Sequence, residues 1–347
     1  MAAKTKISWA DSTCNLWIGC VEISPACDHC YARELAERYG WTNWGGPRIR
    51  CAQGWKDARK FQRAANDNGG VDPELGRRRR VFINSLSDFF DNHKTILWRE
   101  EAWQLIRECP DVIFILLTKR PENIRKMLPA DWGDGWDNVW IGTTIEDQER
   151  ANHRLPHLLA VPAAVHWVSM EPLLGEVDLR RIELKGTSWL LDALTGVVYM
   201  RDDATLAELK VQHPLALQPL RKIGCVVTGG ESGNHARLSH PAWFDRLRDD
   251  SFATSTPFFF KQWGEWISVR DLPEDVTDKL YHPAPRRNPE ATRRCKVPQA
   301  VLQLDGRTED FFHNGAMLMF RAGRARDPET LKGKQHLEFP QDRRLAA

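Results

Sequence analysis

The sequence predicts an α/β fold in which a parallel sheet forms an open doubly wound sheet or a full or partial (β/α) TIM-like barrel. Short, nearly continuous runs of Val, Ile, Leu and Phe recur along the chain, a pattern typical of strands buried on both faces of a parallel sheet. Turns and helical patterns follow most of these runs, as in repeated βα units. The length of 347 residues suits one large barrel.

The expected elements follow this βα order. We expect the first strand at 15–20 and its helix at 31–40. The next strand, 81–90, precedes a helix at 94–109. The strand at 112–121 precedes a short helix that begins at Pro121, because proline suits the first helical position. The remaining strands are expected at 138–147, 164–174, 223–233 and 256–264, with helices at 148–160 and 240–250.

Two regions interrupt this rhythm. Residues 176–221 are too many for an ordinary connection between a helix and a strand, so we interpret them as an insertion. Residues 268–347 lack clean alternation and are rich in Arg and Pro, so we interpret them as a C-terminal extension that packs on the barrel. The barrel itself is then expected to comprise residues 1–175 and 222–267.

Polar residues gather where six of the expected strands end. In parallel α/β folds that edge carries binding and chemistry. Helix caps and turns also favour Ser, Thr and Asp, but six polar ends in register favour a shared site. They are Ser85, Ser87, Asp88, Thr118, Lys119, Arg120, Thr143, Thr144, Glu146, Ser169, Glu171, Glu231, Ser232, Lys261 and Gln262.

Four charged members of this set are candidate catalytic residues: Lys119, Glu171, Glu231 and Lys261. Charged side chains inside a mouth of this kind can act as general acids or bases. Ion pairs around the rim of the mouth would place the same residues there for stability alone. Catalysis and ion pairing therefore both remain possible roles for them.

The composition narrows the class of protein. No apolar run approaches the roughly 18 residues that a membrane span needs, and the N-terminus lacks the apolar core of a signal peptide. We therefore expect a cytoplasmic protein without a membrane partner. In a reducing compartment, clustered cysteines favour metal binding or catalysis over disulfides. The eight cysteines are Cys14, Cys20, Cys27, Cys30, Cys51, Cys109, Cys225 and Cys295.

The basic residues are unevenly distributed although the formal net charge is only +2. Arg77–Arg80 is a run of four arginines, and the C-terminal extension holds a second group. Solvated loops are the simpler interpretation, and a phosphate-contacting patch is the alternative. The second group comprises Arg286, Arg287, Arg293, Arg294 and Lys296.

Three cysteines lie close together in the stretch GCVEISPACDHCY, with the spacing C-x6-C-x2-C. A C-x2-C pair places two thiolates on one metal with little loop strain. An iron–sulfur cube on Cys20, Cys27 and Cys30 would leave one iron open for chemistry. Zinc with His29 or Cys14 as a fourth ligand, and plain packing of the thiols, are the alternatives. The cluster follows the first expected strand and therefore belongs to the mouth with the polar strand ends.

Several short blocks resemble one family in the same order. The opening WADSTCNLWIGCVEISPACDHCYA is similar to that of a phage- and mobile-element-associated family of radical-SAM-like proteins with a three-cysteine motif. The blocks NSLSDFF, LLTKRPENI, VWIGTTIED, SMEPLLG, VTGGESG, FFFKQWGEW and the closing FRAGRARDPETLKGKQHLEFP resemble it as well. The resemblance covers most of the chain.

This resemblance implies a radical-SAM-type barrel with a [4Fe–4S] cluster on Cys20, Cys27 and Cys30 and S-adenosyl-L-methionine (SAM) on the open iron. Reductive cleavage of SAM would give methionine and a 5′-deoxyadenosyl radical. The superfamily spacing is C-x3-C-x2-C, whereas this chain has six residues between its first two cysteines. The segment that receives the SAM amino group would correspond to Ser85–Asp88. The expected cofactor-binding residues are Ser85, Ser87, Asp88, Thr143, Glu146, Gly229, Gly230 and Ser232.

The substrate class is inferred less directly. The resemblance to a phage-associated family, the arginine runs and the 15 tryptophans favour a nucleic-acid substrate, with DNA favoured over RNA. Repair or modification of a base would then be the reaction, with a partner protein encoded nearby as a further expectation. The alternatives are a radical-SAM enzyme acting on a peptide or small molecule, and a non-enzymatic iron–sulfur or zinc protein that binds nucleic acid.

Overall fold

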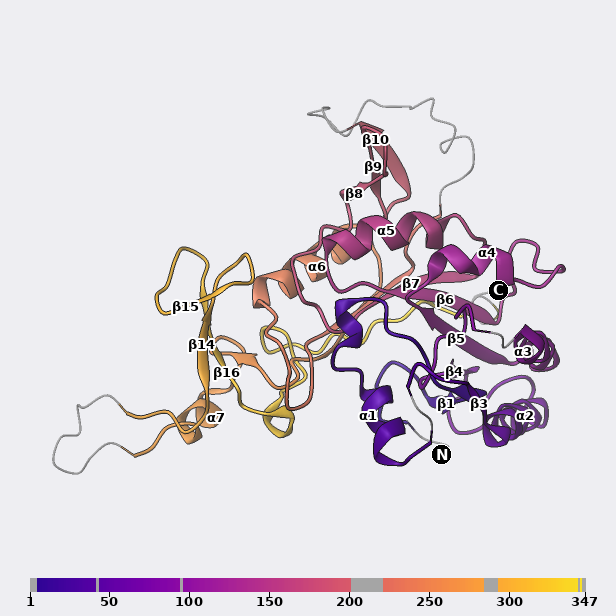
Figure 1. Ribbon diagram of the computed structural model, residues 1–347, viewed down its shortest axis with the longest axis horizontal. Helices are drawn as coiled ribbons and strands as arrows, with labels where there is room; N and C mark the ends of the chain where they lie inside the picture. Colours follow the sequence, from indigo (N-terminus) through magenta and orange to yellow (C-terminus); the bar gives the residue numbers. More distant parts are fainter. Residues whose placement is uncertain are drawn as a thin grey trace.

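The computed structural model describes residues 5–41, 44–93, 96–200, 221–283, 293–342 and 344. Its main sheet has seven strands in the order β1-β4-β5-β6-β7-β11-β12, and every neighbouring pair is parallel. The sheet curls into a partial barrel (Figure 1). This confirms the α/β class and the parallel sheet. The strands are β1 (Ser12–Cys14), β4 (Arg79–Ile83), β5 (Val112–Thr118), β6 (Val139–Thr144), β7 (Val165–Met170), β11 (Cys225–Gly229) and β12 (Phe258–Gln262).

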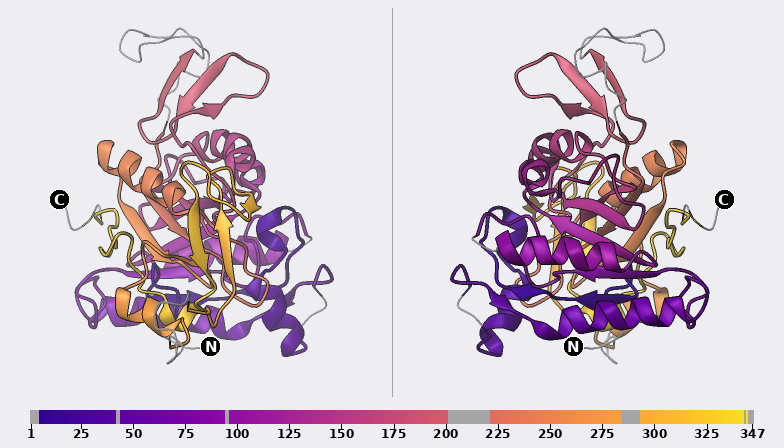
Figure 2. Two further views of the ribbon diagram at one scale, coloured as in Figure 1. Left: turned by 90° about the vertical axis from the view of Figure 1, so that its left-hand side faces the viewer. Right: turned by 90° about the vertical axis from the view of Figure 1, so that its right-hand side faces the viewer.

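Helices follow most of the strands, as in βα units. Strand residues such as Val81 and Phe114 join Phe61, Trp103 and Leu155 of the helices in one large buried cluster. Figure 2 shows helices lying along the outside of the curled sheet. The helices are α1 (Tyr31–Arg38), α2 (Ala52–Asn66), α3 (Ile96–Glu108), α4 (Ile124–Met127), α5 (Gln148–Leu159), α6 (Pro241–Ala253) and α7 (Glu274–Lys279), with short 3-10 turns η1 (Pro25–Cys27), η2 (Pro121–Asn123) and η3 (Arg324–Arg326).

The inner face of the sheet has its own core. Alternate strand residues, among them Phe82, Trp140 and Phe259, pack there against Trp9 of the N-terminal segment. The C-terminal segment covers the edge strand β12: the amide of Phe260 donates to the carbonyl of His336 at 2.9 Å. An exposed edge strand would offer unpaired backbone groups to other chains. The two ends of the chain therefore fill and close the partial barrel below its mouth.

The beginning of the chain differs from the sequence prediction. The first strand of the main sheet is Ser12–Cys14, so the strand expected at 15–20 is wrong in position. Residues 15–20 turn away instead, and β2 (Trp17–Ile18) pairs antiparallel with β3 (Ile49–Arg50). This run is apolar because Leu16 and Trp17 are buried against the helices.

Helix α2 was not predicted, and its position depends on one close approach. A Cβ atom on Gly54 would lie 2.2 Å from the carbonyl oxygen of Asn15. Only glycine lets the helix come this near to the turn after β1.

Two smaller sheets lie outside the main one. In the described part of the insertion, β8 (Ile182–Glu183), β9 (Trp189–Asp192) and β10 (Val197–Met200) form an antiparallel sheet. Figure 1 shows it standing away from the partial barrel. In the C-terminal extension, β13 (Ile267–Ser268), β14 (Gln299–Leu302), β15 (Thr308–Glu309) and β16 (Met317–Phe320) form a four-stranded sheet in the order β13-β16-β14-β15. In the described ranges, no helix has the length and apolar character of a membrane span.

The four-arginine run is structural. Arg77 donates to both oxygens of Asp11 at 2.8 Å, and the Nε of Arg78 donates to Asp342 at 2.7 Å. Arg79 pairs with Asp72 at 2.6 Å, and the guanidinium of Arg80 lies 3.7 Å from the ring centroid of Phe339. Neither the solvated-loop nor the phosphate-patch interpretation holds for this run, because its charges tie the two chain ends to β4.

The second basic group is only partly described. Arg293 pairs with Asp278 at 2.9 Å, and the Nζ of Lys296 donates to the carbonyl of Lys279 at 2.9 Å. Arg286 and Arg287 lie outside the described residues.

Acid should weaken this attachment of the chain ends. Burial raises the pKa of Asp11 and of Asp342, but hydrogen bonds from Arg77 and Arg78 respectively outweigh it and hold both below the ordinary value. The unfolded chain therefore binds protons first as pH falls, and folding stability declines below about pH 4. Urea unfolding at neutral and acidic pH should show this decline. Asp342→Asn should lessen it, whereas the exposed control Asp134→Asn should not.

Candidate active site at the mouth of the partial barrel

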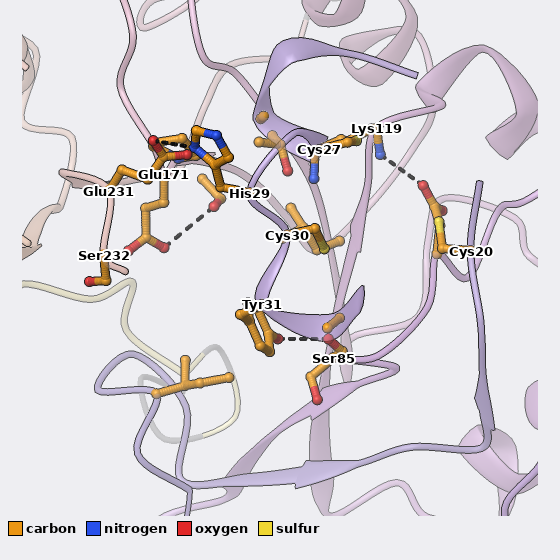
Figure 3. A pocket seen from close by; sticks show the side chains of 18 of the residues that line it. Cys20, Cys27, His29, Cys30, Tyr31, Ser85, Lys119, Glu171, Glu231 and Ser232 are labelled. Carbon is orange, nitrogen blue, oxygen red and sulfur yellow. Dashed lines mark hydrogen bonds and ion pairs between the residues drawn. The ribbon is translucent and has the colours of Figure 1, made fainter. Parts of the chain in front are cut away.

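A cavity of about 560 Å³ opens where the parallel strands end. Its volume lies within the range of roughly 300–1,000 Å³ that is usual for cofactor and ligand sites. Figure 3 shows side chains from the cysteine loop and from several strand ends facing it. The sequence-predicted residues that line it are Cys20, Cys27, Cys30, Ser85, Ser87, Asp88, Thr118, Lys119, Arg120, Thr144, Ser169, Glu171, Gly230, Glu231, Ser232, Lys261 and Gln262.

The three cysteines border this cavity from one loop. Cys20 follows β2, Cys27 ends η1, and Cys30 directly precedes α1. Cys27 is buried and the other two are half-buried, and all three are free thiols. The three thiols that the spacing C-x6-C-x2-C singles out therefore border one cavity.

The three thiols are the candidate metal ligands of this cavity. Among the described residues, no three His, Cys, Asp or Glu side chains converge as ligands for a metal ion. A structural zinc ion holds its sulfur ligands about 2.3 Å from one centre. An iron–sulfur cube carries iron at several corners, so its cysteine ligands lie farther apart than those of a single ion. Three soft thiols around one cavity suit a metal that binds thiolates, as both zinc and iron–sulfur clusters do.

Arg120 holds the first cysteine from the end of β5. Its Nη1 donates to the sulfur of Cys20 at 3.8 Å and to Asp88 at 3.1 Å. Its Nη2 donates to the carbonyl of Val21 at 2.7 Å. Burial raises the pKa of the Cys20 thiol to about 11, and the Asp88 carboxylate adds to this rise while Arg120 opposes it.

Glu231 and Arg237 hold the part of the loop around the other two cysteines. Arg237 donates to both oxygens of Glu231, at 2.8 and 2.6 Å. It also reaches the loop, donating to Asp28 at 3.1 Å and to the carbonyl of Pro25 at 3.0 Å. His29 lies 3.2 Å from Glu231 (Figure 3). These contacts fix the segment that carries Cys27 and Cys30.

The carboxylate of Glu231 is thus engaged by its neighbours. Burial raises its pKa, but the hydrogen bonds from Arg237 and His29 outweigh burial and hold it below the ordinary value. A carboxylate of this kind stays ionised and is a poor proton donor. The contacts of Glu231 therefore favour a role in positioning the cysteine loop over the general acid–base role expected from the sequence.

Glu171 and Lys261 form a second charged pair, at the ends of the two strands that flank β11. The Nζ of Lys261 lies 3.0 Å from Glu171, and both side chains are largely buried. The indole of Trp9 donates to the other oxygen of Glu171 at 3.0 Å. The pair comes from the ends of β12 and β7. It places an ammonium and a carboxylate against the cavity, which is a suitable arrangement for moving a proton to or from a bound ligand.

The end of β4 presents hydroxyl and carboxylate groups. The hydroxyl of Tyr31 donates to the carbonyl of Ser85 at 2.6 Å, and the hydroxyl of Ser87 donates to the carbonyl of Trp17 at 3.1 Å. Asp88 accepts from the hydroxyl of Thr118 at 2.7 Å and from the amide of Lys119 at 3.0 Å. Asp88 is therefore the centre of a hydrogen-bond network that joins β4 to β5. It also borders the cavity.

The glycine pair after β11 is shaped by its neighbours. A Cβ on Gly230 would lie 1.9 Å from the carbonyl oxygen of Trp263, so only glycine fits there. Gly230 and Ser232 line the cavity, whereas Gly229 does not. Gly229 lies within the sheet, and its carbonyl accepts from the amide of Leu173 at 3.1 Å.

Three expected cofactor-binding residues therefore lie elsewhere: Gly229, Thr143 and Glu146. Thr143 is buried, and its hydroxyl donates to the carbonyl of Thr118 at 2.7 Å. Glu146 is fully buried and pairs with Arg154 of α5 at 2.7 Å. Neither residue lines the cavity, and these contacts engage the hydroxyl of Thr143 and one carboxylate oxygen of Glu146 within the sheet and its helix.

Other lining residues had little or no signal in the sequence. Trp9 and Asn84 line the cavity but were not among the expected site residues. Asn84 adjoins the polar end of β4 and could have been included on that ground. In the part of the chain that the structure describes, the Nδ2 of Asn84 and the Oε1 of Gln262 are buried without a hydrogen-bond partner. One offers a donor and the other an acceptor to a bound molecule.

Comparison with known proteins gives one result. No curated protein and no solved structure matches the chain. One family model matches residues 4–340, nearly the whole chain. The chain therefore belongs to the family described as "Protein of unknown function (DUF5131)".

Proposed function

We propose that this protein is an iron–sulfur enzyme of the radical-SAM type that modifies or repairs a nucleic-acid base, with DNA favoured over RNA. One observation carries the proposal. The three cysteines of the C-x6-C-x2-C loop border the same cavity as Lys119, Glu171 and Lys261, at the C-terminal edge of a partial parallel barrel. That edge is where such folds carry their chemistry.

The cysteines would be the ligands of a [4Fe–4S] cluster, and the cavity beside them would receive SAM. The chemistry that these groups supply when bound is the reductive cleavage of SAM to methionine and a hydrogen-abstracting 5′-deoxyadenosyl radical. The protein binds and orients them. Ser85 and Ser87 on one wall and Gly230 and Ser232 on the other offer hydroxyl and backbone groups to the cofactor.

The remaining lining groups would handle the substrate. The Glu171–Lys261 pair can hold a proton beside the reacting atoms. The unpartnered Nδ2 of Asn84 can donate to an acceptor on a heterocycle, and the unpartnered Oε1 of Gln262 can accept from a donor on it. Because all four residues are buried or nearly so, they also exclude water from the site.

A nucleic-acid substrate draws support from the cations and aromatic rings at the mouth. Lys6, Lys119 and Arg324 line the cavity, as does the half-exposed ring of Tyr31. Cations there could track phosphates, and rings could stack on an extruded base. The four-arginine run lends no support, because its side chains are paired within the protein.

Anaerobic reconstitution with iron and sulfide tests the proposal. A bound cluster should give a broad visible absorption band and about four irons per chain. Addition of dithionite and SAM should then release 5′-deoxyadenosine, measured by liquid chromatography and mass spectrometry. A colourless protein with stoichiometric zinc would contradict the proposal. For the substrate, DNA binding should weaken steeply with rising salt, and binding that is insensitive to salt would count against a phosphate-tracking mouth.

A further inference from the structure

The cysteine loop is held at two points by two arginines with different partners. Arg120 holds the beginning of the loop through Cys20 and Val21. Arg237 holds the later part through Pro25 and Asp28. The segment between Cys20 and Cys27 therefore has a separate anchor near each end.

The two anchors differ in what they touch. Arg120 donates an N–H to a sulfur atom, that of Cys20, at 3.8 Å. In the described ranges, the hydrogen bonds of Arg237 go to oxygen atoms of the loop and of Glu231. Both arginines thus position the loop, but of the two only Arg120 contacts the sulfur of a proposed metal ligand.

Arg120 is also well placed to act electrostatically. It is 6% exposed, and its partner Asp88 is equally buried, so solvent screens its charge weakly. Reduction of an iron–sulfur centre adds a negative charge. A buried cation and an N–H···S hydrogen bond stabilise that charge and raise the reduction potential.

We propose that Arg120 is a positioning residue that fixes Cys20 and raises the reduction potential of an iron–sulfur centre on the three cysteines. This inference rests on the proposed function. Arg237 positions Cys27 and Cys30 through Glu231 and leaves the potential unchanged.

A redox titration of the reconstituted protein tests the electronic part. Arg120→Gln should shift the midpoint of the reduced-cluster electron paramagnetic resonance signal to a lower potential. Arg120→Lys keeps the cation, so its midpoint should lie much closer to the wild-type value. Arg237→Gln is the matched control, because it loosens the same loop without losing a contact to sulfur. It should lower iron retention while the midpoint stays at the wild-type value. Equal midpoints in Arg120→Gln and wild type, or equal shifts in Arg120→Gln and Arg237→Gln, would overturn this part.

Hydrogen–deuterium exchange of the metal-free protein tests positioning without a cluster. Arg120→Gln should speed exchange severalfold at residues 20–22, and Arg237→Gln should do so at 25–30. Arg120→Lys serves as the second variant, because removal of the cation takes away the ion-pair partner of buried Asp88 and can destabilise the fold. Unchanged exchange at 20–22 in Arg120→Gln would refute the positioning role. If wild-type protein assembles no cluster, the proposed function and the electronic part both fail, and exchange alone decides the positioning part.

Discussion

Cys30→Ala should assemble no stable iron–sulfur centre, and its production of 5′-deoxyadenosine should fall to background. The thiolate is one of the three proposed cluster ligands, and alanine cannot replace it. The fold should survive the change. Cys30 stands at the N-cap of α1 but makes no side-chain capping bond, so little helix stability depends on its sulfur. Iron and sulfide analysis, visible absorption and thermal unfolding measure the two effects separately.

Cys295→Ala is the matched control. Cys295 is also a half-buried free thiol, but it lies in the C-terminal extension, where its sulfur donates to the carbonyl of Leu280 at 3.5 Å. This variant should keep wild-type iron content and product. If Cys30→Ala retained both the cluster and the product, the ligand assignment would be wrong. If Cys295→Ala lost them as well, the loss would reflect general instability rather than ligation.

The βα pattern was predictable because buried parallel strands carry their signal in short runs of residues. The run 112–118, for example, is almost wholly apolar and forms β5 as expected. The first strand was missed because Ser12–Cys14 carries no such run. Its apolar neighbours Leu16 and Trp17 gave the strand signal but fill the helix-facing core. Tertiary packing outweighed local pattern at this point.

The mouth was predictable for a different reason. Parallel strands end at one edge, so polar residues that follow them meet without any knowledge of loop geometry. The failures came from partners that lie far apart in sequence. Thr143 and Glu146 follow the rule, yet the hydroxyl of Thr143 donates to a carbonyl of β5, and one carboxylate oxygen of Glu146 pairs with a guanidinium of α5. Nothing in the local sequence marks Arg237 as the residue that fixes the cysteine loop.

The charged residues of the mouth also show where the simpler interpretation holds. An ion-paired rim was the alternative to catalysis, and it describes Glu231, which Arg237 engages on both oxygens. Glu171 and Lys261 are paired as well, but they line the cavity. Lys119 lines it too, and within the described ranges its ammonium makes no hydrogen bond or ion pair that would hold it away from a ligand. Lys119, Glu171 and Lys261 therefore remain the candidates for contact with substrate.

Arg154→Leu should destabilise the protein by about 3–5 kcal/mol, because it leaves the carboxylate of Glu146 buried without its partner. The pair is 2.7 Å apart, and the two side chains are 4% and 0% exposed. The same guanidinium donates to the carbonyl of Thr144 at 2.8 Å. Urea unfolding followed by circular dichroism would show the loss as a lower midpoint.

Arg150→Leu is the control on the same helix. Arg150 pairs with Asp147 and Glu149, but it and its partners are substantially exposed. Its loss should therefore cost about 0–1 kcal/mol. A similar small cost for Arg154→Leu would mean that water or another cation reaches Glu146. That outcome would reopen a binding role for Glu146. If Arg154→Leu lowers the unfolding free energy by several kcal/mol and the folded variant keeps wild-type iron content, the carboxylate of Glu146 has a structural role. Its charge then stabilises the sheet and helix rather than a ligand.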